Sequence, residues 1–207
     1  MSYIVAEELV KKYGKGDATV TAVSDISFRI ESGEFIGVMG ESGAGKSTLL
    51  SIMGAMNAPT SGQFVVDDID VYSLTQEKQA DFRREFLGFI FQSFHLVPYL
   101  TVFENVMLPL TIVKAGRKQK RSMVENALSQ VGLLDKADRL PSQISGGEKE
   151  RVAIARAVVN EPPVLLADEP TGNLDSKTSA EIMKLLQRLN ADGMTIIMVT
   201  HCSECAQ

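Results

Sequence analysis

Cysteine is scarce in this sequence. Its 207 residues include only two, Cys202 and Cys205, near the end of the chain. Their C-x-x-C spacing is compatible with redox or metal chemistry, but a structural zinc site needs about four ligands and no second pair exists. We therefore expect two reduced thiols rather than a metal or redox centre.

Long apolar runs are also missing. The runs at 35–39 and 164–167 have the length of a strand, far below the ~20 apolar residues that span a bilayer. Residues 1–10 contain no basic segment followed by a long apolar stretch, so no signal peptide is visible. We expect a cytoplasmic protein whose membrane role comes through a partner.

Positive charge is in deficit, with a net charge of -5 and an isoelectric point of about 5.2. The densest basic cluster, Lys118, Lys120 and Arg121, is short, and we interpret it as the exposed start of a helix. A nucleic-acid-binding protein usually presents a basic face, so we expect no nucleic-acid partner. The remaining composition, 44% hydrophobic and 23% charged, is typical of one soluble globular domain.

The hydrophobic periodicity predicts alternating strands and helices. Strands are expected at 3–13, 20–30, 35–39, 63–66, 164–167 and 195–200. Helices are expected at 46–56, 77–86, 147–159 and 176–189, and the pattern is helical throughout 101–131. This alternation indicates a parallel sheet with crossover helices, interrupted by a mainly helical insertion near 93–158.

The most specific motif lies between the strand at 35–39 and the next helix. The segment GESGAGKS at 40–47 fits G-x-x-x-x-G-K-[ST], whose glycines let successive backbone N–H groups point at phosphate oxygens. The following helix directs its positive end at the same place. The expected nucleotide-binding residues are Gly40, Glu41, Ser42, Gly43, Ala44, Gly45, Lys46, Ser47 and Thr48. Lys46 is expected at the β- and γ-phosphates and the Ser47 hydroxyl on Mg²⁺.

Two acids end the apolar strand predicted at 164–167. Asp168 and Glu169 therefore stand at the carboxyl end of a strand, where α/β sheets bind ligands. Asp168 suits the Mg²⁺ shell, and Glu169 is expected to polarise the attacking water as a general base. A solvated acidic turn is the simpler alternative, and the nearby glycine-rich loop argues against it.

A second glycine-rich loop, ISGGEK at 144–149, precedes the helical run 152–157. A serine cap followed by glycines is another anion-binding helix start. Its expected contact residues are Ser145, Gly146, Gly147 and Glu148. One phosphate chain seldom needs two such loops, so the second makes sense if it closes on the nucleotide of a partner subunit.

At this point the sequence resembles the ATP-binding-cassette (ABC) family over essentially all 207 residues. The segment 144–149 is similar to the signature loop of that family, and Gln92 matches its glutamine loop. The segment 172–175 matches its D-loop, His201 matches its switch histidine, and Tyr13 stands where an aromatic stacks on adenine.

The phrases EPTGNLD at 169–175 and LTVFENV at 100–106 most resemble one subgroup of the family. That subgroup serves lipoprotein release, macrolide export, peptide-antibiotic resistance and cell division.

The resemblance implies a fold and a domain plan. The fold is α/β, a P-loop NTPase (RecA-like) core with an N-terminal antiparallel β subdomain and a helical insertion subdomain. Residues 1–207 form one ABC ATPase domain, with 1–92 and 159–207 as the nucleotide-binding core and β subdomain. Residues 93–158 form the helical subdomain that carries the signature loop. Because the chain stops at Gln207, just after a strand, we expect that its C-terminal end is missing, truncated or not covered.

The resemblance also implies residue roles. Gln92 touches Mg²⁺ and water and senses the membrane partner, and His201 contacts the γ-phosphate and holds Glu169 and the water. Asp175 makes contacts across a dimer. The alternatives are a polar strand end for Gln92, a buried structural histidine for His201, a helix cap for Asp175 and a plain strand tyrosine for Tyr13.

Two residues depart from the family pattern. Glu148 stands where the signature usually has Gln, and a negative charge near a partner's nucleotide is expected to weaken closure modestly by like-charge repulsion. Cys202 stands where the subgroup generally has Asp, and nothing in the sequence explains it.

The resemblance therefore implies an ATPase that hydrolyses ATP to ADP and phosphate with Mg²⁺. Two copies would sandwich two ATP molecules and drive export or extraction through a separate membrane permease, placing the protein peripherally on the inner face of the membrane. The alternative is the ATPase of a membrane signalling complex of the cell-division type. A soluble ABC ATPase acting on nucleic acid is a third reading, and the acidic charge and single cassette argue against it.

Overall fold

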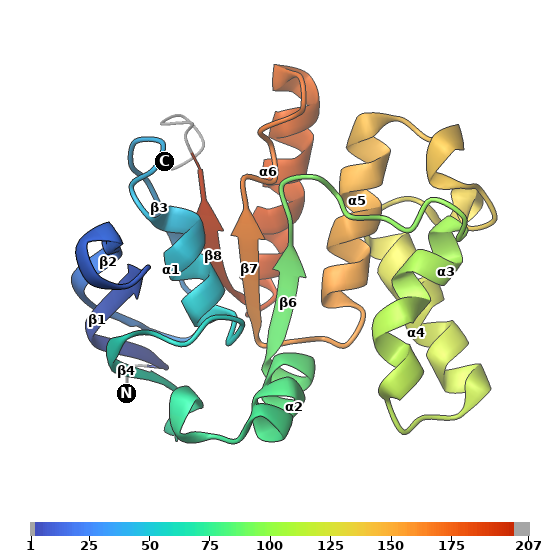
Figure 1. Cartoon of the computed structure of the whole chain (residues 1–207). Coiled ribbons are helices and arrows are strands. Elements are labelled where there is room, and N and C mark those ends of the chain that lie inside the picture. The colour runs from blue at the N-terminus through green and yellow to red at the C-terminus, as the bar shows by residue number, and fades with distance from the viewer. Residues whose placement is uncertain (1–2, 201–207) are drawn as a thin grey trace.

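Two four-stranded sheets organise the chain, and the computed structural model describes them over residues 3–200 (Figure 1). The antiparallel sheet has the order β2 (Val20–Ile30), β1 (Ile4–Tyr13), β4 (Ser61–Val66), β5 (Ile69–Asp70). The parallel sheet has the order β3 (Phe35–Val38), β8 (Thr195–Val199), β7 (Val164–Asp168), β6 (Leu87–Ile90). The predicted α/β fold with an N-terminal antiparallel sheet is confirmed.

Six α-helices are described in residues 3–200. They are α1 (Lys46–Met53), α2 (Gln76–Phe86), α3 (Val102–Met107), α4 (Arg117–Gln130), α5 (Gly146–Val158) and α6 (Ser176–Ala191). Short 3-10 turns lie at η1 (Gly16–Ala18), η2 (Val71–Ser73), η3 (Leu108–Ile112), η4 (Leu134–Lys136) and η5 (Pro141–Gln143). None of these helices is long and apolar enough to cross a membrane.

Two of the predicted helical stretches were too long. The helix expected at 46–56 ends at Met53, where Gly54 caps it and Ala55 turns into the left-handed region at φ 52. The pattern over 101–131 is divided into α3, η3 and α4. Pro109 near the start of η3 and Gly116 before α4 break it, since both residues disfavour a helix interior.

The parallel sheet separates two hydrophobic cores. Along β7, Val164 and Leu166 belong to the core that contains α1 and the antiparallel sheet. Leu165 and Ala167 belong to the core that contains α3 to α6. Because side chains alternate across a strand, β7 is buried on both faces, which explains its uninterrupted apolar sequence.

The helices α3, α4 and α5 gather beyond the β6 edge of this sheet, on the right in Figure 1, and α1 lies toward the β3 side. All four strands of the sheet are parallel, so their carboxyl ends meet at one edge. The glycine-rich loop, the two acids and the segment after β6 all leave the sheet at that edge. The topology therefore collects the predicted phosphate-binding and catalytic residues of the core in one place.

Candidate functional site

The loop at 40–48 joins β3 to α1 and turns tightly. Gly43 and Gly45 have φ 82 and φ 86, in the left-handed region that favours glycine. A Cβ atom on Gly45 would lie 1.9 Å from the carbonyl oxygen of Ala22 on β2. Glycine is required at this position for both reasons, and the loop is held against the antiparallel sheet.

The lysine of the loop folds back into it. Lys46 is buried, and its Nζ donates hydrogen bonds to the carbonyl oxygens of Gly40 at 2.9 Å and Glu41 at 2.8 Å. The N-cap of α1 is Gly45, which offers no side chain to the first turn, and no side-chain cap bond is present there. An ammonium group and an uncapped helix start together form a site suited to phosphate oxygens.

Ser47 and Asp168 supply oxygen ligands beside the loop. Asp168 is the last residue of β7, and the Ser47 hydroxyl donates to its Oδ1 at 3.3 Å. Burial raises the pKa of the Asp168 carboxyl, and the neighbouring charge of Glu169 adds to the rise, while the Ser47 hydrogen bond opposes it. A hydroxyl and a carboxylate are ligands that Mg²⁺ accepts together with water and phosphate.

In the described part of the chain, protein side chains alone do not form a cage for a metal ion. Within residues 3–200, no group of three or more His, Cys, Asp or Glu side chains is placed to hold a metal ion. A divalent cation at Ser47 and Asp168 would complete its shell with water and phosphate, as Mg²⁺ commonly does in phosphoryl-transfer enzymes.

Glu169 and Gln92 meet at the same sheet edge. The Gln92 Nε2 donates to Glu169 Oε2 at 2.9 Å. The backbone of Glu169 has φ 50, a conformation that is uncommon for this residue type, and its N–H donates to the Val199 carbonyl of β8 at 3.0 Å. Asn173 Nδ2 donates to the Gln92 carbonyl at 2.9 Å. From the sequence, Asn173 was part of the segment 172–175 that matches the D-loop, but this contact was not predicted.

The second glycine-rich loop caps its own helix. Ser145 is the N-cap of α5, its Oγ accepts from the Glu148 N–H at 3.3 Å, and Glu148 Oε2 accepts from the Ser145 N–H at 2.9 Å. Lys136 Nζ also donates to Glu148 Oε1. The hydrogen bond from Lys136 is the main cause that lowers the pKa of the Glu148 carboxyl, and the Ser145 amide adds to it. No sequence motif pointed to Lys136, which lies 12 residues from its partner.

The same loop packs on the start of α6. A Cβ atom on Gly147 would lie 2.3 Å from Cγ2 of Thr178. Thr178 is held in place by Asp175, the N-cap of α6, whose carboxylate accepts from the Thr178 N–H at 3.0 Å and from its hydroxyl at 2.6 Å. Asp175 thus makes the helix-capping contact that the simpler alternative predicted.

The two glycine-rich loops do not meet within one chain. The main contacts of helix α1 are with β2, β7 and β8, whereas those of α5 are with β6, α3, α4 and α6. Figure 1 places the two helices on opposite sides of β7. The structure brings together Ser47 with Asp168 and Gln92 with Glu169, but it leaves the loop of Ser145 away from the loop of Lys46.

Two predicted residues remain. Tyr13 ends β1 with 43% of its surface exposed, its ring centroid lies 5.1 Å from Lys11 Nζ, and its hydroxyl accepts a hydrogen bond from Asn57 Nδ2. His201 lies outside the described residues 3–200, as does Cys202.

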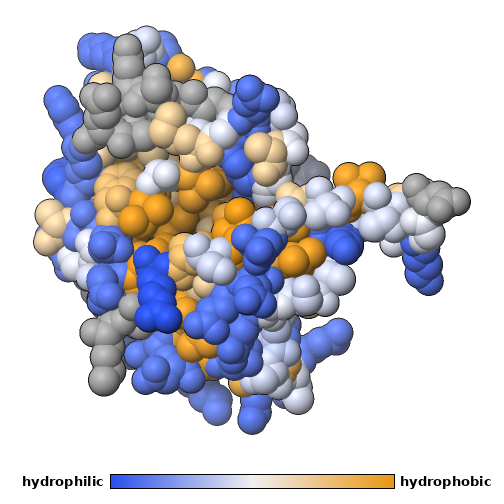
Figure 2. Space-filling model, turned by 90° about the vertical axis from the view of Figure 1, so that its left-hand side faces the viewer, coloured by the Kyte–Doolittle hydropathy of each residue, from blue (hydrophilic) through white to orange (hydrophobic). Residues whose placement is uncertain are grey.

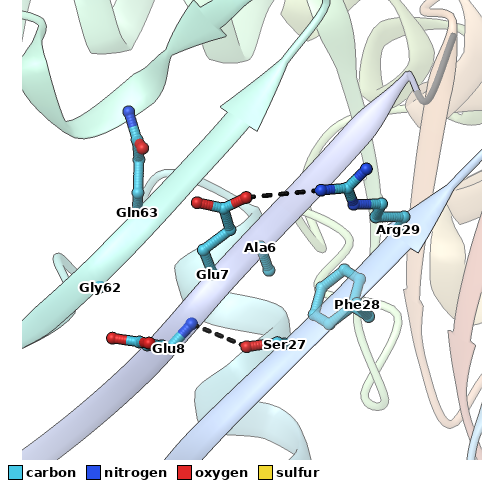
Figure 3. Close-up of a pocket in the computed structure, with 8 residues that line it drawn as sticks. All are labelled: Ala6, Glu7, Glu8, Ser27, Phe28, Arg29, Gly62 and Gln63. Carbon is cyan, nitrogen blue, oxygen red and sulfur yellow. Dashed lines mark hydrogen bonds and ion pairs between the residues drawn. The ribbon is translucent and has the colours of Figure 1, made fainter.

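A further hollow lies on the antiparallel sheet. Figure 2 views the side of the molecule at the left of Figure 1, where apolar side chains gather in a hollowed centre framed by hydrophilic ones. The hollow in Figure 3 is lined from β1, β2 and β4. Two contacts cross it: Arg29 pairs with Glu7 at 3.7 Å, and the Glu8 N–H donates to Ser27 Oγ at 2.9 Å. Its lining contains no residue of the loop at 40–48.

Comparison with known proteins identifies the family. The family model described as ABC transporter matches residues 23–172. An uncharacterised ABC transporter ATP-binding protein, MJ1508 of Methanocaldococcus jannaschii, is 46% identical over 201 residues, covering 97% of this chain and 90% of that relative. The macrolide export ATP-binding/permease protein MacB of Rhodopseudomonas palustris is 43% identical over 205 residues, which cover 99% of this chain but 31% of the relative.

Solved structures agree with the sequence relatives. The dimeric post-hydrolysis state of the ATP-binding cassette MJ0796, bound to ADP and Pi, superposes with a TM-score of 0.89 at 40% identity, covering 98% of this chain and 90% of that chain. With its phosphate loop, its acids at the end of β7 and its second glycine-rich loop, the chain belongs to the ABC transporter family and is an ATP-binding, ATP-hydrolysing subunit.

Proposed function

We propose that this ATPase works as a dimer of two copies and drives export or extraction of a substrate through a separate membrane permease. The observation that carries the proposed dimer is the separation of the two glycine-rich loops, one on each side of the parallel sheet. Each loop has the features of half a phosphate site, and a second copy is the simplest source of the other half.

The phosphates of ATP are bound by the loop at 40–48. Lys46 exchanges its contacts with the Gly40 and Glu41 carbonyls for phosphate oxygens, and the N–H groups at the start of α1 donate to the same oxygens. Ser47, Asp168 and Gln92 would hold Mg²⁺, which when bound would neutralise charge on the phosphates.

Glu169 acts on the attacking water. Its carboxylate accepts a proton from the water or orients it toward the γ-phosphate, and the 2.9 Å hydrogen bond from Gln92 fixes one of its oxygens. We expect His201, which lies outside the described residues, to hold Glu169 and the water in place. Catalysis then consists of positioning and charge stabilisation, since little covalent chemistry is left to the protein in phosphoryl transfer.

Residues 145–148 of one copy close on the nucleotide of the other. Ser145 and the backbone of Gly146 and Gly147 provide the contacts, Asp175 lies at the dimer contact, and Tyr13 stacks on adenine. The solved dimer of the cassette MJ0796 with ADP and Pi supports this arrangement. ATP binding closes the dimer, and hydrolysis with phosphate release opens it.

The membrane partner docks where the helical insertion meets the core. We propose that residues 93–158 act as a subdomain on the core formed by 1–92 and 159–207. A hollow between α2, β6, η3 and α5 includes Arg83, Ile112 and Arg156, with Ile112 65% exposed. A short segment of the permease would cover it. The fusion of ATP-binding and permease functions named in MacB supports such a partner, which would keep the protein on the inner face of the membrane. The alternative, a signalling complex of the cell-division type, uses the same ATP site.

The variant Glu169→Gln tests this function. It is expected to bind ATP, to shift from monomer to dimer when ATP is added, and to lose at least about 100-fold in turnover, the scale of a missing general base. Size-exclusion chromatography with light scattering and a phosphate-release assay measure the two effects. A variant that stays monomeric with ATP, or that hydrolyses it at the parent rate, contradicts the proposal.

A further inference from the structure

Glu148 presents an electrostatic problem for the proposed dimer. It stands at the third position of α5, in the loop that would approach a partner's triphosphate. A glutamate there completes the capping box with Ser145, and a glutamine would complete the same box without a charge. The carboxylate opposes the positive end of the helix and repels phosphate, so an uncompensated Glu148 would weaken the contact that the loop exists to make.

Lys136 lies where its ammonium group can neutralise the Glu148 carboxylate. Its Nζ contacts Glu148 Oε1, while the other carboxylate oxygen accepts from the Ser145 N–H. The side chains of Lys136 and Glu148 are 36% and 16% exposed, so solvent reaches the lysine end of the pair and screens it in part.

The backbone around Lys136 is anchored independently of Glu148. The N–H of Phe103 donates to the Ala137 carbonyl at 2.8 Å, and the N–H of Val102 donates to the Arg139 carbonyl at 2.8 Å. Both donors belong to the start of α3, so the turn that carries Lys136 is fixed to α3 while its side chain reaches α5. The lysine is therefore a preformed partner for the Glu148 carboxylate.

We infer that Lys136 is a positioning residue for the shared ATP site: it neutralises Glu148 and holds its carboxylate in the capping geometry, so that the start of α5 attracts the nucleotide of the second copy. The inference rests on the proposed dimer. The sequence alone led to the expectation that the negative charge of Glu148 weakens dimer closure. Because Lys136 pairs with Glu148, the two side chains together bring no net charge to the interface.

A double-mutant cycle tests the inference. Lys136→Met, Glu148→Gln and the double variant are made in the Glu169→Gln background, and the dissociation constant of the ATP-bound dimer is measured by analytical ultracentrifugation. With Glu148 present, Lys136→Met weakens the dimer by about five- to tenfold, the size expected for one partly screened charge. With Gln at position 148, the same substitution changes the constant by less than about twofold, since no charge is left to compensate.

Two further variants and the salt dependence sharpen the result. Lys136→Arg keeps the charge and is expected to restore the dimer, and Lys136→Gln is expected to repeat the loss seen with Met. The loss shrinks as salt is raised, because exposed charges are screened. ATP binding to the monomer, which uses the loop at 40–48, reports that each variant is folded.

The outcomes separate the two hypotheses. If Lys136→Met weakens the dimer equally with Glu or Gln at position 148, Lys136 acts on phosphate directly or only on the fold. If it weakens the dimer in neither case, Lys136 has no role. Each result overturns the inference and leaves the proposed dimer intact. If the Glu169→Gln protein itself fails to dimerise with ATP, the proposed dimer fails and this inference fails with it.

Discussion

Helices α1 and α5 both begin at a glycine-rich loop, yet their first turns are satisfied in opposite ways. At α1 the N-cap is Gly45 in the left-handed region, without a side-chain cap bond. At α5 the N-cap is Ser145, with a complete capping box and an ion pair from Lys136 behind it. A helix start needs partners for its first N–H groups, and the two helices find them in different places.

The difference in capping between α1 and α5 indicates how each half-site depends on its ligand. The first N–H groups of α1 remain available to an external anion. In the absence of that anion, Lys46 Nζ donates to the carbonyl oxygens of Gly40 and Glu41. The start of α5 is formed and capped without any nucleotide. We expect α1 to bind ATP in the single copy, and α5 to add a preformed surface that matters when a second copy arrives.

The largest expected effect comes from breaking the α5 half-site alone. Gly147→Ala places a methyl group 2.3 Å from Thr178 Cγ2, and the threonine cannot easily move because Asp175 binds its hydroxyl. Overpacking of this kind costs about 1–3 kcal/mol. We expect the ATP-driven dimer to weaken by about 10- to 100-fold, measured by sedimentation, with ATP binding to the monomer retained.

A second substitution provides the matched control. Thr178→Ser removes the clashing Cγ2 and keeps the hydroxyl that binds Asp175, so the double variant should recover much of the dimer. Loss of monomer ATP binding in Gly147→Ala, or no recovery in the double variant, would count against the separation of the two half-sites.

The second turns of the helices differ as well. In α1, Leu49 and Leu50 are buried there, whereas α5 buries Glu150, which is 1% exposed. Its Oε1 has no hydrogen-bond partner in the described part of the chain. Burial raises the pKa of the Glu150 carboxyl to about 8, and the charge of Arg156 opposes the rise.

Glu150 makes the folding stability depend on pH. Between the ordinary glutamate value of 4.5 and about 8 the folded chain binds more protons than the unfolded chain, so this group's contribution to stability is complete below that window and is lost as pH rises through it. We expect Glu150→Gln to flatten this decline and to exceed the parent in unfolding free energy by more than about 1 kcal/mol above pH 8. Urea unfolding at several pH values measures it, and parallel curves for parent and variant would refute the assignment.

The smallest effect concerns the α1 side. If Tyr13 stacks on adenine, Tyr13→Ala removes a contact worth about 0.5–1.5 kcal/mol and raises KM for ATP about two- to tenfold with kcat unchanged. Tyr13→Phe keeps the ring and loses only the hydrogen bond from Asn57, so its KM should stay close to that of the parent. Steady-state kinetics decide, and equal KM values in all three proteins would leave Tyr13 as a plain strand residue.

Local sequence predicted the elements that carry local signals. The run of β3, loop and α1 follows from an apolar strand, glycines and a helical pattern, and β7 follows from apolar residues ending in acids. By contrast β6 was not among the predicted strands. Its four residues follow α2 directly, without the glycine or proline that marks a strand boundary elsewhere.

Contacts between distant segments were beyond sequence reasoning. The pairs Lys136–Glu148 and Asn173–Gln92 join segments whose proximity depends on the fold, and neither pair follows a periodicity or a motif. The steric dependence of Gly147 on Thr178 is of the same kind. The sequence predicted the loops themselves, and the structure adds the contacts from other segments that hold them in place.

Mixing two defective variants tests the shared site most directly. Lys46→Ala impairs the phosphate loop and Gly147→Ala impairs the α5 half-site, so each variant alone has two defective sites in its dimer. In a mixed dimer one site combines both defects, and the other combines the intact loop of one copy with the intact α5 start of the other. The account predicts that ATP-dependent dimerisation and hydrolysis reappear on mixing, in proportion to the mixed species. No recovery at any ratio would contradict it.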